Sequence, residues 1–168
     1  MGRTMKHEVH YTSAKTKTGS DVWETPKHVF DWAQNQWGPY VLDACANQDN
    51  TKCAGFYTAE QDSLKQPWVG NVWCNPPYSE LLKWVKKAIC ETEMVCGATV
   101  TMLIPARTDT KAFKLIWQRA AEIVFITGRI KFVGAPSSAP FPSMLVHFDP
   151  NKRDGTVPKV SLVTLPQK

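Results

Sequence analysis

The chain has 168 residues, a length typical of one domain, and 43% of them are apolar, which supports a packed core and excludes a wholly disordered protein. The 20 Lys and Arg residues against 15 Asp and Glu residues give a net charge of +5, which favours an anionic partner such as nucleic acid. No apolar run approaches the roughly 18 residues of a membrane span, and the N-terminal residues form no apolar leader. Five cysteines without a C-x-x-C pair predict reduced thiols, a cytoplasmic protein and no metal site.

Residues 1–20 are polar and basic and lack periodicity, so we expect a flexible basic arm there. Residues 21–168 alternate apolar runs with turn residues and are predicted to form a single folded domain.

Helical spacing of apolar residues predicts a first helix from Pro26 to about Trp37, which Gly38-Pro39 ends. A second helix is predicted after a cap at Ser79. A third is predicted over 109–119, with Phe113, Ile116 and Trp117 facing inward. Predicted strands cover residues 40–43, 53–58, 68–73, 98–104, 123–126, 129–133 and 143–148, with an edge strand over 160–165.

The order of these elements predicts an α/β fold. Strands that first alternate with helices and then follow one another form a sheet that is mostly parallel, with an antiparallel strand pair at one end. Only 32 positions separate Asp43 from Asn75, too few for two or three full crossovers, so the first half of the sheet is expected to be reduced.

The most informative residues are Asn75-Pro76-Pro77-Tyr78, which follow a predicted strand and precede a predicted helix. Proline has no backbone N–H, so the side-chain oxygen of Asn75 and the carbonyl of Pro76 can converge as two hydrogen-bond acceptors. Two such acceptors suit an amino group, and Tyr78 offers a flat face on which an amide or a base can stack. The tetrapeptide therefore predicts a site that acts on an amino group.

This tetrapeptide resembles the amino-methyltransferase signature [DNS]-P-P-[YFW]. Together with seven further segments, it resembles the phage-encoded DNA adenine-N6 methyltransferase (Dam) family over about residues 20–150. In chain order, these segments are Trp23-Glu24-Thr25-Pro26, Leu42-Asp43-Ala44-Cys45-Ala46, residues 53–64, Val72-Trp73-Cys74, residues 105–110, Gly128-Arg129-Ile130-Lys131-Phe132 and Ala139-Pro140-Phe141-Pro142-Ser143.

The resemblance implies a compact Rossmann-like methyltransferase sheet that binds S-adenosylmethionine. It also implies methyl transfer to the N6 amino group of an adenine flipped out of duplex DNA, in a bacterial cell that carries the phage or prophage. Catalysis would fall to Asn75, Pro76, Pro77 and Tyr78. The glycine-rich F-x-G-x-G of the wider methyltransferase pattern is replaced here by Ala44-Cys45-Ala46.

The residues that would bind the cofactor by this resemblance are Trp23, Thr25, Pro26, Asp43, Ala44, Cys45, Asp62 and Asn75, with Glu60 an equal contender to Asp62. Phosphates of DNA would be held by Arg107, Lys111, Arg129 and Lys131, and Phe132 or Phe141 would close the second face of the base.

Three alternatives stay open at this point. An RNA adenine methyltransferase would show nearly the same residues, and a protein glutamine methyltransferase also uses N-P-P-Y, for an amide nitrogen. From another class, the chain could be a nucleic-acid-binding module that has lost its cofactor.

Overall fold

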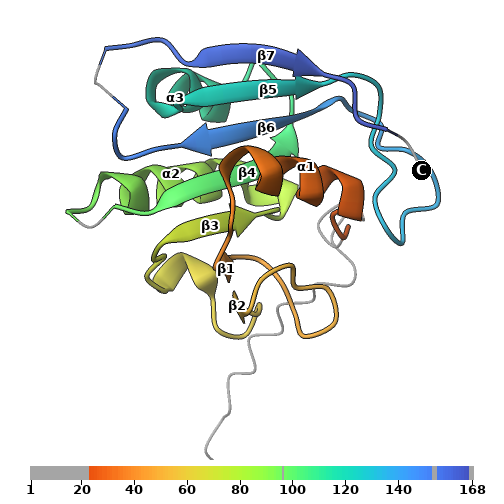
Figure 1. Ribbon diagram of the computed structural model, residues 1–168, viewed down its shortest axis with the longest axis horizontal. Helices are drawn as coiled ribbons and strands as arrows, with labels where there is room; N and C mark the ends of the chain where they lie inside the picture. Colours follow the sequence, from red (N-terminus) through yellow and green to blue (C-terminus); the bar gives the residue numbers. More distant parts are fainter. Residues whose placement is uncertain (1–22, 96, 153–154, 167–168) are drawn as a thin grey trace, which may run out of the picture.

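The computed structural model describes residues 23–95, 97–152 and 155–166, so the arm predicted at 1–20 lies outside it. Within these ranges seven strands form one sheet in the order β2-β1-β3-β4-β6-β5-β7 (Figure 1). The strands are β1 (Leu42–Asp43), β2 (Gly55–Phe56), β3 (Asn71–Cys74), β4 (Thr99–Pro105), β5 (Glu122–Ile126), β6 (Ser143–Phe148) and β7 (Lys159–Val163). The helices are α1 (Lys27–Trp37), α2 (Leu81–Glu93) and α3 (Lys111–Arg119), with single 3₁₀ turns η2 (Ser63–Lys65) and η3 (Tyr78–Glu80).

The predicted strand directions are confirmed. β2, β1, β3 and β4 are parallel, β6 is antiparallel to both β4 and β5, and β7 lies parallel to β5 at the edge. Helix α2 connects β3 to β4 and α3 connects β4 to β5, whereas no α-helix connects β1 to β2 or β2 to β3. The reduced first half is therefore confirmed as well.

Alternate residues of β3, β4, β5 and β6 serve two separate cores, as the pleat of a sheet requires. Trp73 and Leu103 pack with α1, whereas Val72, Cys74 and Met102 pack with α2 and α3. The result is a three-layer domain with α1 on one face and α2 and α3 on the other (Figure 1).

Two predictions about the helices are wrong. Ser79 lies inside η3, and α2 begins only at Leu81, after Glu80 at its N-cap position, so Ser79 is not the cap. Trp117 is 44% exposed, because Ala112 and Ile116 form the buried face of α3 and the next residue along a helix is rotated by about 100°.

The strand predicted over 129–133 is also wrong. Both edges of β5 are already paired, one with β6 and one with β7, so no neighbouring sheet edge is left for it. The chain instead turns at Gly128 and Gly134, both with positive φ, and packs Ile130 and Phe132 into the α1-side core as a loop.

Candidate active site

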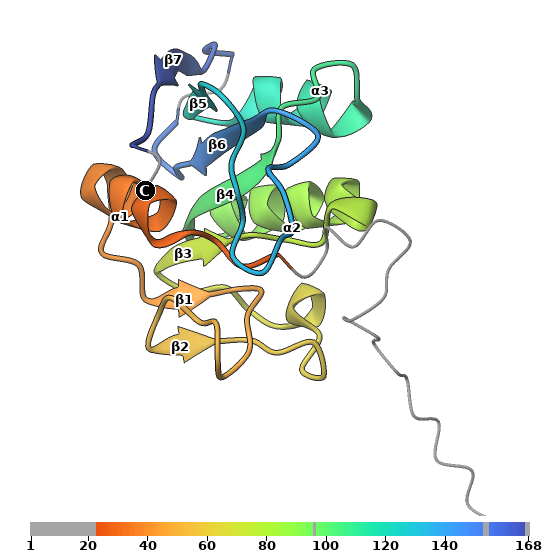
Figure 2. The ribbon, with the colours of Figure 1, turned by 90° about the vertical axis from the view of Figure 1, so that its right-hand side faces the viewer.

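The predicted site residues gather where the parallel strands β1, β3 and β4 end, the edge at which open α/β sheets bind ligands. Two other segments reach this edge, residues 23–26 before α1 and the loop 128–142 between β5 and β6 (Figure 2). The backbone N–H of Val133 donates to the carbonyl of Glu24 at 3.0 Å, and the N–H of Ala106 donates to the carbonyl of Pro142 at 2.9 Å. The site is thus built from segments far apart in the sequence.

Asn75 lies at the end of β3 with both ends of its carboxamide bound. Its Nδ2 donates to the main-chain carbonyl of Trp23 at 2.9 Å, and its Oδ1 accepts from the Tyr78 hydroxyl at 3.0 Å. Pro76 and Pro77 are buried, so the turn that holds Asn75 and Tyr78 is anchored in the domain.

Four aromatic rings surround this turn. Trp23 is stacked on Phe132 with ring centroids 5.3 Å apart and lies 6.2 Å from Phe141, while Tyr78 meets Phe141 nearly edge-on at 5.6 Å. Phe132, one of the two rings expected to close on the base, is only 1% exposed and belongs to the core in this structure. Phe141 is half-buried and is the more accessible of the two.

Asp43 ends β1 and is 3% exposed. Its Oδ1 accepts from the backbone N–H of Cys45 at 3.3 Å and its Oδ2 from that of Lys52 at 3.1 Å. Burial raises the pKa of this carboxyl group to about 6, against the lowering effect of the two backbone bonds and of the Lys52 charge. Asp43 therefore holds both ends of the loop that follows β1.

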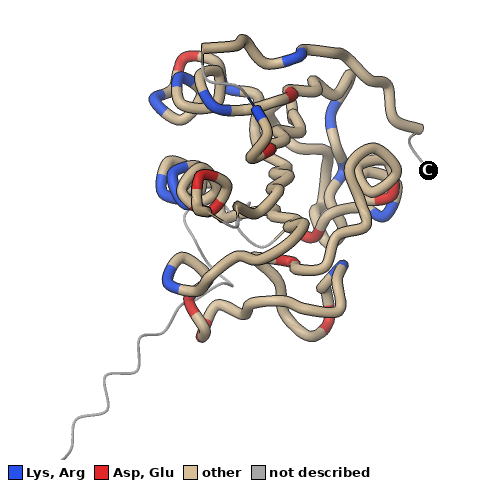
Figure 3. The backbone as a smooth tube through the Cα atoms, turned by 60° about the vertical axis from the view of Figure 1, so that its left-hand side comes forward, with Lys and Arg blue, Asp and Glu red and all other residues tan. Residues whose placement is uncertain are grey.

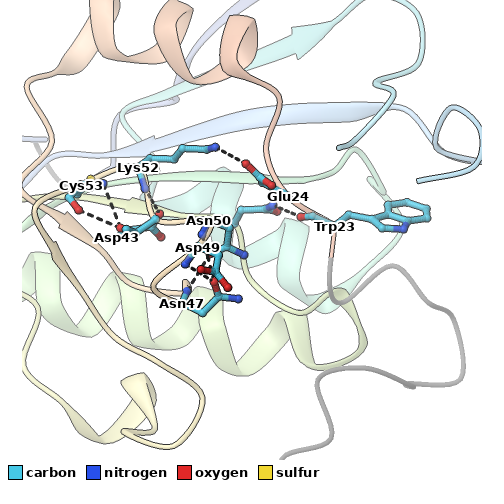
Figure 4. Close-up of polar contacts among 10 residues, drawn as sticks. Trp23, Glu24, Asp43, Asn47, Asp49, Asn50, Lys52 and Cys53 are labelled. Carbon is cyan, nitrogen blue, oxygen red and sulfur yellow. Dashed lines mark hydrogen bonds and ion pairs between the residues drawn. The ribbon is translucent and has the colours of Figure 1, made fainter. Parts of the chain in front are cut away.

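A second carboxylate lies on the opposite side of Lys52. The ammonium group of Lys52 meets Glu24 Oε1 at 2.7 Å, with the side chains 18% and 32% exposed (Figure 4). The chain between Asp43 and Lys52 is turned by Asn47, whose side-chain oxygen accepts from the N–H groups of Asp49 and Asn50 at 2.9 and 3.1 Å. The loop after β1 is thus shaped by polar contacts.

The four basic residues predicted to hold phosphates, Arg107, Lys111, Arg129 and Lys131, are all exposed. The guanidinium of Arg107 lies 5.6 Å from the ring centroid of Phe141, which places it beside the Asn75–Tyr78 turn. By contrast, basic and acidic residues lie close together on the helices at the left of Figure 3, and Lys83 and Lys87 of α2 pair with Glu80 and Glu91.

Comparison with known proteins decides the family. The model of the family "DNA N-6-adenine-methyltransferase (Dam)" matches residues 12–165. The chain is 38% identical over 157 residues to the DNA N-6-adenine-methyltransferase of Haemophilus phage HP1 (strain HP1c1), over 89% of this chain and 90% of that protein. It belongs to the Dam family. Membership makes it an adenine-specific DNA methyltransferase and confirms the resemblance found in the sequence.

Two other similarities complete this picture. The methyltransferase is 42% identical over 108 residues to the DNA N-6-adenine-methyltransferase of Escherichia phage T1, covering 63% of this chain and 44% of that protein. Among solved structures, a predicted O-methyltransferase, Atu636 from Agrobacterium tumefaciens, overlaps 84% of this chain and 64% of its own, with 15% identity and a TM-score of 0.37. At that TM-score the structural likeness adds nothing to the family assignment.

The other cofactor candidates of the methyltransferase lie close to the same edge. Thr25 and Ala44 are buried, and Cys45 is half-buried beside Asp43. Asp62 precedes η2 with a positive φ of 52° and pairs with Lys65 at 2.8 Å, while Glu60 is exposed in the loop after β2. Both Asp62 and Glu60 lie in the segment that follows the end of β2.

Two features of the site were missed in the sequence. One is the Glu24–Lys52 ion pair, whose partners lie 28 positions apart, and the other is the contact of Asn75 with the Trp23 carbonyl. The charge of Glu24 next to Thr25-Pro26 could have pointed to the ion pair. The contact with the Trp23 carbonyl could not be found in this way, because every residue has a main-chain carbonyl.

Among the residues that the structure describes, no helix is long and apolar enough to cross a membrane. The same residues contain no group of three or more His, Cys, Asp or Glu side chains placed to hold a metal ion.

Proposed function

We propose that this methyltransferase uses S-adenosylmethionine to methylate the N6 amino group of an adenine flipped out of duplex DNA. The observation that supports it most is the Asn75 carboxamide, bound at both ends and set beside Tyr78 where β3 ends. Its oxygen has a second lone pair, so it can accept from a substrate amino group in addition to the Tyr78 hydroxyl.

The residue types around β1 fit such a cofactor. Its cationic sulfonium, ammonium and ribose hydroxyl groups call for carboxylates, and the candidates near this edge are Glu24 and Asp62. The side chains of Ala44 and Cys45 are small, which allows close approach to the backbone after β1. Asp43 would act mainly by shaping this loop, since both its oxygens already bind backbone N–H groups.

When bound, S-adenosylmethionine supplies a methyl group already activated by the sulfonium, so the chain needs to supply position and acceptors rather than a nucleophile. In the proposed geometry, Asn75 Oδ1 and the Pro76 carbonyl would accept the two hydrogens of the amino group and would so orient its lone pair for attack on the activated methyl group. The thiols near β1 and β3 are not activated as nucleophiles, which agrees with this mechanism. Burial raises the pKa of Cys53 to about 12 and that of Cys74 well above its usual value, so both thiols stay protonated.

The adenine would have to leave the duplex, because a stacked base cannot enter a site formed at a sheet edge; unstacking costs a few kcal/mol. Tyr78 would provide one face for the base and Phe141 the second. Arg107, Lys111, Arg129 and Lys131 would hold the phosphates on either side of it.

Recognition of a long target sequence is not expected. Loop 128–142 is the longest segment without a helix or strand at the site, and Ile130, Phe132, Ala135 and Ala139 anchor it in the core. Its exposed tip, Pro136-Ser137-Ser138, is poor in side chains that read base edges. We propose a site preference of at most about three base pairs, or none. The test is to treat a genome without methylated adenine with the protein and to map the methylated positions. A single strict recognition site of four or more base pairs would contradict the proposal.

The decisive experiment incubates the protein with labelled S-adenosylmethionine and duplex DNA, RNA or protein, and then digests each product. Label is expected in N6-methyladenine of DNA. Asn75→Ala should lose about 10²–10³-fold in turnover, or ~2.7–4 kcal/mol, with cofactor affinity within a few-fold of the original.

The other outcomes are equally clear. Label in RNA adenine or in protein glutamine would support the corresponding alternative, and no transfer would indicate a binding module. Turnover of Asn75→Ala close to that of the unchanged protein would contradict the role of Asn75.

A further inference from the structure

The orientation of the Asn75 carboxamide is determined by a group outside the N-P-P-Y turn. A main-chain carbonyl can only accept hydrogen bonds, so the atom that faces the Trp23 carbonyl at 2.9 Å must be the NH₂ of Asn75. The oxygen then has to point to the other side, where it meets the Tyr78 hydroxyl at 3.0 Å. The Trp23 carbonyl therefore decides which end of Asn75 faces the substrate.

This carbonyl is held from three directions. The ring of Trp23 is stacked on the buried Phe132, with centroids 5.3 Å apart. The next residue, Glu24, accepts from Val133 N–H at 3.0 Å through its backbone and from Lys52 at 2.7 Å through its carboxylate. A position fixed by packing, by a backbone pair and by an ion pair is rigid enough to orient a reacting group.

We propose that the main-chain carbonyl of Trp23 positions Asn75 for catalysis and makes this site selective for a carboxamide over a carboxylate. The inference rests on the proposed function, in which Asn75 Oδ1 accepts from the target amino group. A carboxylate at position 75 would set an oxygen against the Trp23 carbonyl, with no hydrogen between them. It would fit only after protonation, when its O–H could donate as the amide does.

The test is Asn75→Asp, assayed with duplex DNA and labelled S-adenosylmethionine from pH 8 to pH 6 and expressed relative to the unchanged protein at each pH. At pH 8 the variant should lose at least about 100-fold in turnover, the range found for loss of one transition-state acceptor or donor. As the pH falls, protonation should restore part of the activity, so the ratio to the unchanged protein should rise at least about tenfold.

Asn71→Asp is the matched control, because it makes the same chemical change at the other end of β3. Asn71 Nδ2 also donates to main-chain carbonyls, those of Trp37 and of Pro39, the latter at 3.1 Å. This variant should lose stability, but its turnover per folded molecule, relative to the unchanged protein, should not vary with pH. An equal pH response in both variants would show that the effect reports folding and would overturn the proposal.

A second measurement needs no variant. With ¹⁵N in asparagine and ¹³C in the tryptophan carbonyl, NMR should show a coupling across the hydrogen bond between Asn75 Nδ2 and Trp23. Absence of that coupling would overturn the positioning role. So would an Asn75→Asp variant that keeps its activity at pH 8 and follows the pH profile of the unchanged protein. Lack of transfer by the unchanged protein would instead refute the proposed function, while the coupling would still test the contact.

Discussion

Strands β1 and β2 have two residues each and are followed by connections without an α-helix, whereas β4, β5 and β6 have seven, five and six residues and lie against α2 and α3. The second region is held by apolar packing, as the burial of every residue from Val100 to Pro105 shows. The first is held by polar contacts, with Asp43 bound to the loop backbone and Lys52 bound to Glu24.

The Asn75–Tyr78 turn lies at the boundary between these regions, because β3 pairs with β1 on one side and β4 on the other. The comparison suggests a division of work. The packed half anchors the turn through β3 and the buried Pro76 and Pro77, and the polar half holds the Trp23–Glu24 segment that orients the Asn75 carboxamide.

The largest difference should come from truncation of matched apolar residues. Met102 in β4 is fully buried, so Met102→Ala should cost about 2–5 kcal/mol of unfolding free energy, whereas Leu42→Ala in β1, which is half-buried, should cost about 1 kcal/mol. Urea denaturation of both variants measures the difference. Equal losses would mean that the β1 region is packed as firmly as the rest.

A second contrast lies in the pH dependence of stability. The folded protein raises the pKa of Asp43 from 3.8 to about 6, so the contribution of this group is fully present below pH 3.8 and is lost as the pH rises through 6. Relative to Asp43→Asn, the protein should therefore lose up to about 3 kcal/mol between pH 4 and pH 7. Urea titrations at several pH values measure this, and parallel curves for the two proteins would contradict it.

The Glu24–Lys52 ion pair of the polar half should contribute more to the free energy of unfolding than an ion pair on the surface. A double-mutant cycle with Glu24→Gln and Lys52→Met should give a coupling of about 1–2 kcal/mol, because both side chains are largely buried. The same cycle on Lys27 and Asp31 of α1, which are 85% and 46% exposed, should give a few tenths of a kcal/mol, about the usual value for such helix pairs. Similar couplings would remove the special role of the Glu24–Lys52 pair.

The smallest expected effect concerns DNA affinity. Arg107 lies on the packed half beside Phe141, so Arg107→Ala should weaken DNA binding and lower the slope of log affinity against log salt by about 1. Lys65 on the polar half is already paired with Asp62, and Lys65→Ala should leave the slope unchanged. Fluorescence titrations with DNA over a series of salt concentrations measure the slope for both variants. A larger change of slope in the Lys65 variant would contradict the placement of the DNA contact at Arg107.

The sequence predicted best those elements whose pattern is local. The helical spacing around Val29, Phe30 and Ala33 and the β-rich apolar run after Ala98 gave α1 and β4 nearly to the residue. The error at 129–133 has a physical reason. Ile130 and Phe132 alternate with Arg129 and Lys131 as in a strand, but alternation reports which side chains are buried and not whether a sheet edge is free to pair.

The candidate site likewise has a part that is local in the sequence and a part that only the fold brings together. Asn75, Pro76, Pro77 and Tyr78 are adjacent in the chain, so their chemistry was readable from the sequence. The contacts of Asn75 with Trp23 and of Lys52 with Glu24 span 52 and 28 positions and arise only when the segment before α1 meets the chain that follows β1 and β3. The opposite charges of Lys52 and Glu24 were visible, but nothing local in the sequence paired them.

The contact between Asn75 and the backbone of Trp23 has a consequence for protein engineering. Every amino acid presents the same carbonyl, so the hydrogen bond to Asn75 does not depend on which side chain stands at position 23. The backbone pair of Glu24 with Val133 and the Glu24–Lys52 ion pair still hold this carbonyl when the indole is exchanged for another ring, so we expect the Asn75 carboxamide to keep its orientation. We therefore expect libraries at position 23 to alter the ring contacts with Phe132 and Phe141 without removing the backbone acceptor that orients the Asn75 carboxamide.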